Sequence, residues 1–322
     1  MASDTPITDP IPPPANASAV TKWAFLEAGL RHIMTGQYVS FTRAASLCTV
    51  ADDYCKPSKV RGGGKTDRER NEGSMGRDLS NNVSRFFKTY LKTLRAQPNV
   101  LLMLLQHYTQ EWDRYRAGAQ YVHRLFTYFN RHWVKKERDN GRKKGAHPIY
   151  ELALIQWRTN FLRYIQSDNS KLTSATLRLI ERHRNGQEID EELVKKVVDS
   201  FLSLGIVAPD LHKGKLSVYR EEFEIPFLET TEKHYEVKSG AFLAEHTVVD
   251  YARRVEEWLR EEEDRAERCL IVSTKKPLVS RCEIALIKKH SKPMQNTLQS
   301  LPRGEDCQRV HVLLARVPGG LT

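Results

Sequence analysis

Hydrophobic side chains recur every three or four residues along most of this chain, which is the spacing of an amphipathic helix. In residues 22–35 the repeating positions are Trp23, Leu26, Leu30, Ile33 and Met34. The same spacing predicts helices at 40–54, 77–95, 98–116, 119–137, 148–166, 170–184, 190–204, 217–237, 240–268, 277–300 and 305–317. Only residues 214–219 (GKLSVY) resemble a strand, and strands do not alternate with helices anywhere. The pattern therefore predicts an all-α protein, folded as a stacked helical array.

Two segments lack this pattern. Residues 1–21 are rich in proline and small polar residues and contain no apolar core, which predicts a disordered N-terminal tail and not a secretory signal. Residues 56–76 hold five glycines, a proline and many charges, which predicts a long mobile loop. Its GGGKT run (62–66) does not form a phosphate-binding loop, because that motif needs a glycine where the chain has Lys59.

One helix, predicted at 119–136, is apolar on two sides. One stripe consists of Val122, Phe126, Phe129 and Trp133, and a second of Tyr121, Leu125, Tyr128 and His132. Together they span about 160°, wider than the roughly 100° of an ordinary surface helix. Such a helix either packs against neighbours on both sides or turns one stripe toward a partner protein, a role that suits the amphipathic rings of Tyr and His. The pattern alone leaves both interpretations open.

Composition narrows the class of protein. The 322 residues are 40% hydrophobic and 28% charged, as in a soluble globular protein. No apolar run approaches the roughly 20 residues of a membrane helix, so no membrane partner is expected. Five cysteines, odd in number and without a CxxC pair, indicate neither a disulfide framework nor a zinc site, so we expect the cytoplasm or the nucleus.

The net charge of +11 raises the question of nucleic acid. Basic and acidic residues are mostly interleaved, and no aromatic–basic strand signature accompanies them. Nucleic-acid binding through the basic segment 135–147 is therefore kept only as an alternative.

The motifs of common enzymes are missing: the sequence contains no HExxH, GxSxG or kinase-type set. The charged run EEEDRAER (261–268) places Glu and Arg at i,i+4, which is typical of a solvated helix face. We predict no catalytic, cofactor-binding or metal-binding residues, and a protein that is not an enzyme.

Several stretches resemble the cullin family. Residues 110–158 resemble the first cullin repeat, residues 176–205 and 218–270 the second, and residues 278–321 the start of the third. The most specific motifs are YFNRHWV (128–134) and LIERHRNG (179–186). The resemblance covers residues 22 to 321 and is to cullin-1-type scaffolds of SCF ubiquitin ligases.

The resemblance implies an elongated array of stacked five-helix repeats. It divides the chain into a tail (1–21), a first repeat (22–146), a second repeat (147–272) and a partial third repeat (273–322). It also implies a non-catalytic scaffold segment of a cullin-RING ligase, acting in ubiquitin-dependent protein degradation. In that family the second and fifth helices of the first repeat bind a BTB-fold adaptor, which carries an F-box substrate receptor. The double-faced helix 119–136 matches the fifth helix.

The residues that carry over as adaptor-binding are Met34, Tyr38, Val39, Ala45, Cys48, Tyr121, Val122, Leu125 and Tyr128. The second helix departs from the family pattern, because Ala44, Ala45, Cys48 and Asp52 stand where aromatic and Met side chains are usual. Truncating an interface anchor to Ala costs about 1 to 4 kcal/mol of binding. A cullin-like paralogue without adaptor binding is therefore the alternative that keeps the same fold.

The chain stops within the third repeat. Without the family's C-terminal homology region, which recruits the RING protein, no RING partner is expected. We also expect the partial repeat to leave Leu286, Leu298 and Leu313 exposed.

Overall fold

The computed structural model describes residues 9–56, 65–95, 100–141, 145–205 and 215–318, and no strand occurs among them. The all-α prediction is thus confirmed. Parts of the predicted tail (1–8), the predicted loop (57–64) and the basic segment (142–144) lie outside the described residues. The described chain folds as two compact units, the first ending at Lys171 and the second beginning at Leu172.

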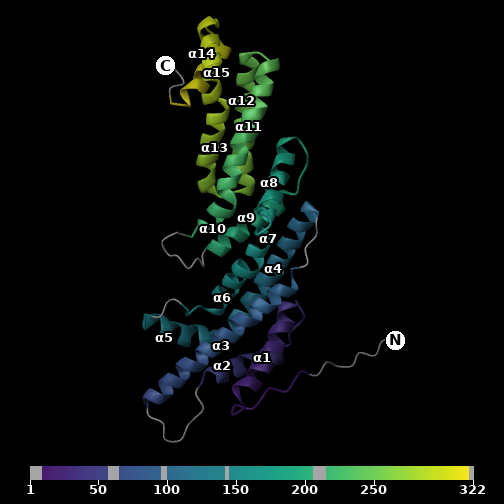
Figure 1. Cartoon of the computed structure of the whole chain (residues 1–322), viewed down its shortest axis with the longest axis vertical. Helices are drawn as coiled ribbons and strands as arrows, with labels where there is room; N and C mark the ends of the chain where they lie inside the picture. The colour runs from purple at the N-terminus through teal and green to yellow at the C-terminus, as the bar shows by residue number, and fades with distance from the viewer. Residues whose placement is uncertain (1–8, 57–64, 96–99, 142–144, 206–214, 319–322) are drawn as a thin grey trace, which may run out of the picture. The chain divides into compact units, whose positions relative to one another are not determined.

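The first unit contains α1 (Ala19–Met34), α2 (Phe41–Cys55), α3 (Lys65–Thr93), α4 (Leu101–Leu125), the π-helical turn η1 (Phe129–Trp133), α5 (Val134–Asp139), α6 (Ile149–Gln156), the π-helical turn η2 (Trp157–Leu162) and α7 (Arg163–Gln166) (Figure 1). The helical residues 149–166 belong to this unit, since α6 packs against α3 and α4. The repeat boundaries at 146/147 and 272/273 stay a prediction.

Aromatic rings form the core between α4 and η2. Trp157 is fully buried, and its ring lies 4.9 Å from that of Tyr115 and 5.2 Å from that of Trp112, centroid to centroid. The Tyr115 hydroxyl donates a hydrogen bond to the carbonyl oxygen of Ala153 at 2.9 Å. The polar end of the ring is therefore satisfied inside the core, as buried tyrosines require.

The predicted loop 56–76 is wrong for residues 65–76, which form the start of α3. Gly73 and Gly76 suggested a loop, but they lie inside the helix for a packing reason. A Cβ atom at Gly76 would collide with the indole of Trp133, and the indole nitrogen donates to the Gly73 carbonyl oxygen at 3.3 Å. The missing side chain of Gly76 lets a large ring lie directly against the helix backbone.

The predicted single helix 119–137 is also wrong. Helix α4 continues through Gly118 and ends at Leu125, after which Phe126 leaves the helical conformation (φ −96°, ψ 34°). The side chain of Asn130 occupies the break: its amide donates to the His123 carbonyl oxygen at 2.8 Å, and its oxygen accepts from the backbone N–H of Ile149 at 2.9 Å. One side chain thus satisfies a carbonyl in the last turn of α4 and the first backbone N–H of α6.

The second unit contains α8 (Lys171–Arg184), α9 (Glu191–Gly205), α10 (Ser217–Tyr219), the π-helical turn η3 (Arg220–Glu224), α11 (Ile225–Glu245), α12 (Val248–Cys269), α13 (Val272–Leu286), the 3-10 turn η4 (Lys288–His290), α14 (Ser291–Ser300) and α15 (Glu305–Ala315). Helices α11, α12 and α13 lie along one another (Figure 1). The strand suggested at 214–219 is wrong for its described part, which is helical from Ser217.

The expected exposed leucines are mostly covered. Leu286 and Leu313 are fully buried, and Leu298 is half-buried. Helix α13 packs on α11 and α12, and α15 packs on α12 and α14, so this part of the chain closes its own core. The expectation of a bare apolar face is wrong because these helices pack on the preceding ones.

Candidate protein-docking surface

The two apolar stripes of residues 121–133 have different surroundings. The first stripe is buried throughout, and the Phe129 and Trp133 rings stack in the core at 4.9 Å. In the second, Tyr121 and Tyr128 are half-buried and His132 is exposed; only Leu125 is buried. Three of the four residues of this second stripe therefore keep exposed surface, which favours a surface role over packing on both sides.

Six of the predicted adaptor-binding residues reach the surface of the first unit. They are Tyr38, Val39, Ala45, Cys48, Tyr121 and Tyr128, and we call them the docking surface. They come from the turn after α1, from α2, from α4 and from the residue before η1. Helix α2 packs against both α4 and η1, which brings these segments together.

The other three predicted residues, Met34, Val122 and Leu125, lie in the core. Met34 packs against α4 where the chain has Gly118: a Cβ there would lie 2.7 Å from the Met34 sulfur. Tyr90 donates its hydroxyl to the Met34 carbonyl oxygen at 2.8 Å. In the free chain these three side chains support the surface from below, and adaptor contact by any of the nine stays a prediction.

The α2 face is shallow where larger side chains were expected. Ala45 is exposed, and Ala44, Cys48 and Asp52 are half-buried. At the N-terminal end of α2, Phe41 is 87% exposed beside Tyr38, which is 86% exposed. Phe41 was missed in the sequence, although it lies one helical turn before Ala45 and thus on the same face.

Charged groups at the C-terminal end of α2 face η1. Burial is the main cause that raises the pKa of Asp52, and Asp53 adds to the rise, whereas Lys56 and His132 oppose it. The Lys56 ammonium lies 5.6 Å from the centre of the Tyr128 ring, within the range of a cation–π contact. Burial and the Asp52 charge raise the pKa of the Cys48 thiol. This thiol is therefore mostly protonated at neutral pH, unlike a catalytic thiolate.

The described residues offer no metal site, because no three His, Cys, Asp or Glu side chains come together to ligate an ion. None of the described helices is both long and apolar enough to cross a membrane. What the surface does provide is exposed aromatic area on a rigid helical base.

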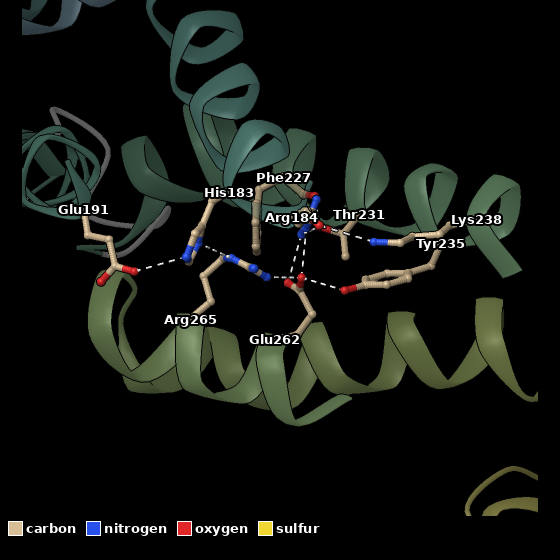
Figure 2. A network of polar contacts seen from close by, with 9 residues as sticks. All are labelled: His183, Arg184, Glu191, Phe227, Thr231, Tyr235, Lys238, Glu262 and Arg265. Carbon is tan, nitrogen blue, oxygen red and sulfur yellow. Dashed lines mark hydrogen bonds and ion pairs between the residues drawn. The ribbon is translucent and has the colours of Figure 1, made fainter. Parts of the chain in front are cut away.

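A buried ionic network in the second unit was missed in the sequence. Figure 2 shows Glu262 between Arg184 and Arg265, with Arg184 binding both carboxylate oxygens at 2.9 Å. Tyr235 donates to the same carboxylate at 2.8 Å, and Arg184 donates to the Thr231 hydroxyl at 2.7 Å. The interpretation of residues 261–268 as a solvated face is wrong for Glu262 and Arg265, which are buried. The burial of these two charges could have been predicted from helical spacing. Glu262 and Arg265 continue the apolar stripe that Val255 and Trp258 begin.

This network holds its carboxylate ionised. Burial alone raises the pKa of Glu262, but Arg184, Arg265 and the Tyr235 hydroxyl together lower it to about 2. Such a group does not exchange protons near neutral pH. The network therefore links α8, α11 and α12 and has no evident part in proton transfer.

A cavity of about 510 Å³ beside this network is lined by Arg184, Lys238, Arg254, Arg265 and Arg268 among others. Each of these arginines already pairs with a carboxylate: Arg184 and Arg265 with Glu262, Arg254 with Glu257, and Arg268 with Glu191. The positive charges of the cavity are thus nearly balanced by paired carboxylates, which argues against an anion site there.

Comparison with known proteins agrees with the fold and with the resemblance. The model of the cullin α-solenoid domain matches residues 23–322. Cullin-1 of Dictyostelium discoideum is 34% identical over 310 residues, which cover 93% of this chain and 40% of that protein. Cullin-1 of Caenorhabditis elegans is 31% identical over 322 residues, and cullin-1 of Schizosaccharomyces pombe 29% over 308. The chain spans about two fifths of the length of these relatives. Since the family model covers nearly the whole chain, the chain belongs to the cullin family.

Proposed function

We propose that this chain is a non-catalytic scaffold segment of an SCF-type cullin-RING ubiquitin ligase, and that its docking surface binds a BTB-fold adaptor carrying an F-box protein. Membership of the cullin family and the likeness to cullin-1 proteins support the scaffold role. Its place of action under this proposal is the cytoplasm or the nucleus.

The observation that carries the adaptor proposal is the uncovered second stripe. Tyr121 and Tyr128 are half-buried, and the rings of Tyr38 and Phe41 are exposed at the turn after α1 and at the start of α2. Tyrosine side chains dominate binding energy at many interfaces, because they bury large area with little loss of rotamer freedom. The stacked aromatic core beneath α4 holds this surface rigid, which lowers the entropic cost of docking.

The direct test is a calorimetric titration of the purified chain with an adaptor–F-box complex. We expect Tyr38→Ala and Tyr128→Ala each to weaken binding at least about tenfold, the cost of losing an interface anchor. Tyr164→Ala is the matched control, because Tyr164 is exposed on α7, outside the docking surface. A folded chain that does not bind, or that binds with equal affinity in all variants, contradicts the proposal.

A further inference from the structure

A basic hollow of about 410 Å³ adjoins the docking surface. It is lined by Cys55, Gly73, Tyr128, Arg131, His132, Trp133, Lys135, Lys136, Asp139 and Asn140. Its floor is fixed, because the Trp133 ring stacks on Phe129 and donates to the Gly73 carbonyl oxygen. The close approach of Trp133 to Gly76 leaves that ring little room to move.

The charges of the basic hollow are unbalanced. Arg131, Lys135 and Lys136 line it, and Asp139 is the one carboxylate among its described lining residues. Arg131 and Lys135 are exposed, and neither forms an ion pair with the described residues. Like charges four residues apart on a helix repel each other. A carboxylate bound between Arg131 and Lys135 relieves that repulsion.

Spacing alone does not make this a site. Lys88 and Lys92 repeat the same i,i+4 pair of exposed cations on α3, but they line neither the basic hollow nor the cavity beside Glu262. What distinguishes the basic hollow is the combination of the cation pair with a concave aromatic floor.

The basic hollow is continuous with the docking surface. Tyr128 belongs to both, and its ring lies tilted against that of His132 at 4.4 Å between centroids. A partner that covers Tyr128 therefore reaches the hollow lined by Arg131 and Lys135.

We propose that the basic hollow takes an acidic segment of the docked adaptor–F-box complex, with a carboxylate between Arg131 and Lys135 and apolar atoms on Trp133. This inference rests on the function proposed above. A protein segment fits better than nucleic acid, because the described lining holds only three cations together with Asp139, whereas an extended phosphate backbone needs a longer basic track.

The test compares two charge reversals of equal size in the same titration. Arg131→Glu/Lys135→Glu reverses two of the three cations that line the basic hollow, and Lys88→Glu/Lys92→Glu changes the net charge equally elsewhere in the first unit. At about 50 mM salt we expect the first double variant to weaken binding about tenfold and the second less than about twofold, with the difference shrinking at about 300 mM. All four side chains are exposed, and circular dichroism checks that both variants fold.

Tyr38→Ala separates the two proposals, because Tyr38 belongs to the docking surface and does not line the basic hollow. If Tyr38→Ala loses binding while Arg131→Glu/Lys135→Glu binds like the wild type, the docking surface stands and the basic hollow is overturned. If the wild-type chain binds no adaptor complex, the proposed function fails, and the adaptor as occupant fails with it.

A second assay tests the chemistry of the basic hollow without the adaptor. It follows a fluorescein-labelled deca-glutamate peptide by anisotropy, with a single-stranded oligonucleotide as a separate ligand. Peptide binding that is lost in Arg131→Glu/Lys135→Glu and kept in Lys88→Glu/Lys92→Glu supports recognition of an acidic segment. Absence of peptide binding, or tighter binding of the oligonucleotide at the same residues, overturns it.

Discussion

At Glu262 a single carboxylate meets two guanidinium groups and a tyrosine hydroxyl inside the second unit. Removing a charge from water is expensive, and here the cost is offset by hydrogen bonds to both oxygens. The three groups come from α8, α11 and α12, so the contacts of one residue join three helices.

Glu262→Gln should therefore destabilise the chain strongly. The amide cannot balance Arg184 and Arg265, and leaving such charges unpaired in the interior costs about 3 to 5 kcal/mol. Urea unfolding followed by circular dichroism measures this. Glu261→Gln is the matched control, because Glu261 is the preceding residue and its side chain is 43% exposed; its effect should stay within about 0.5 kcal/mol. Equal effects of the two substitutions on the free energy of unfolding would show that the buried network does not stabilise the fold more than a surface ion pair.

The lowered pKa of His234 should make the stability of the chain depend on pH. Burial, with help from the charges of Arg184 and Lys238, lowers the pKa of this imidazole to about 4, and its Nε2 has no hydrogen-bond partner among the described residues. Between pH 6.5 and 4 the unfolded chain therefore binds a proton that the folded chain does not, so the free energy of unfolding falls as the pH drops through this window.

We expect His234→Phe to reduce the loss of stability between pH 7 and pH 5 by about 1 kcal/mol, a value discounted for the partial exposure of the ring. Urea titrations at the two pH values measure it. The same substitution should leave the loss below pH 4.5 in place, because that loss comes from Glu262, whose pKa of about 2 lies below its unfolded value of 4.5. An unchanged slope between pH 7 and pH 5 would rule out His234 as its source.

At the scale of helices, the spacing of hydrophobic residues predicts most of the elements but places several boundaries wrongly. Gly73 and Gly76 suggested a loop, yet both lie inside α3. Helices α4 and α11 likewise continue through Gly118 and Gly240, beyond the predicted ends at 116 and 237. Two of them, Gly76 and Gly118, are needed where a ring or a methionine sulfur lies against the helix. This requirement belongs to tertiary packing and leaves no trace in the local pattern.

The candidate site was predictable only in part. The two stripes of residues 121–133 are visible in the sequence, because they follow helical spacing. That only one of them is covered, and that Met34 and Leu125 lie below the surface, depends on which helices pack together. The exposure of Phe41 and the basic hollow depend on the same packing.

Gly76 and Gly73 give a matched test of the packing argument. Gly76→Ala should destabilise the chain by about 1 to 3 kcal/mol, because the new methyl group overlaps the indole of Trp133. Gly73→Ala should stabilise it by about 0.5 to 1 kcal/mol, since a Cβ there meets nothing within 4 Å and alanine favours the helix. Denaturant unfolding of both variants measures the effects, and the same sign for both would contradict this packing.

The shallow face of α2 suggests a gain of function. Cys48→Tyr adds a ring at a half-buried position between Ala45 and Asp52, where the cullin resemblance leads us to expect a larger side chain. We expect it to strengthen adaptor binding by about 1 kcal/mol, or about fivefold, through added aromatic contact. Thr49→Tyr, one residue along and on a different side of α2, is the control. Calorimetry showing equal gains, or none, would mean that this face does not touch the adaptor.

At the scale of the whole molecule, stability and docking should be separable between the two units. Glu262→Gln acts in the second unit and Tyr38→Ala in the first, and the hydrogen-bond and ion-pair partners of Glu262 all lie in the second. Effects of substitutions without shared partners usually add to within about 0.3 to 0.5 kcal/mol.

We therefore expect Glu262→Gln to lower unfolding stability while changing the adaptor affinity of the folded chain by less than about twofold. Tyr38→Ala should do the reverse. Calorimetry below the unfolding transition, together with urea titration, measures both quantities for each variant. A loss of adaptor affinity in Glu262→Gln as large as that in Tyr38→Ala would place part of the interaction in the second unit.

Because the cysteines are unevenly buried, their rates of chemical modification can report on partner binding. Cys55, Cys269 and Cys282 are buried, whereas Cys48 and Cys307 are half-buried. Burial raises the pKa of Cys55 to about 12, which further protects it from alkylation. In mildly alkaline buffer a thiol reagent should thus modify mainly Cys48 on α2 and Cys307 on α15. A partner docked on α2 should slow the modification of Cys48 and leave that of Cys307 unchanged as an internal reference. The ratio of the two modification rates then measures how much of the chain is bound, without any engineered label.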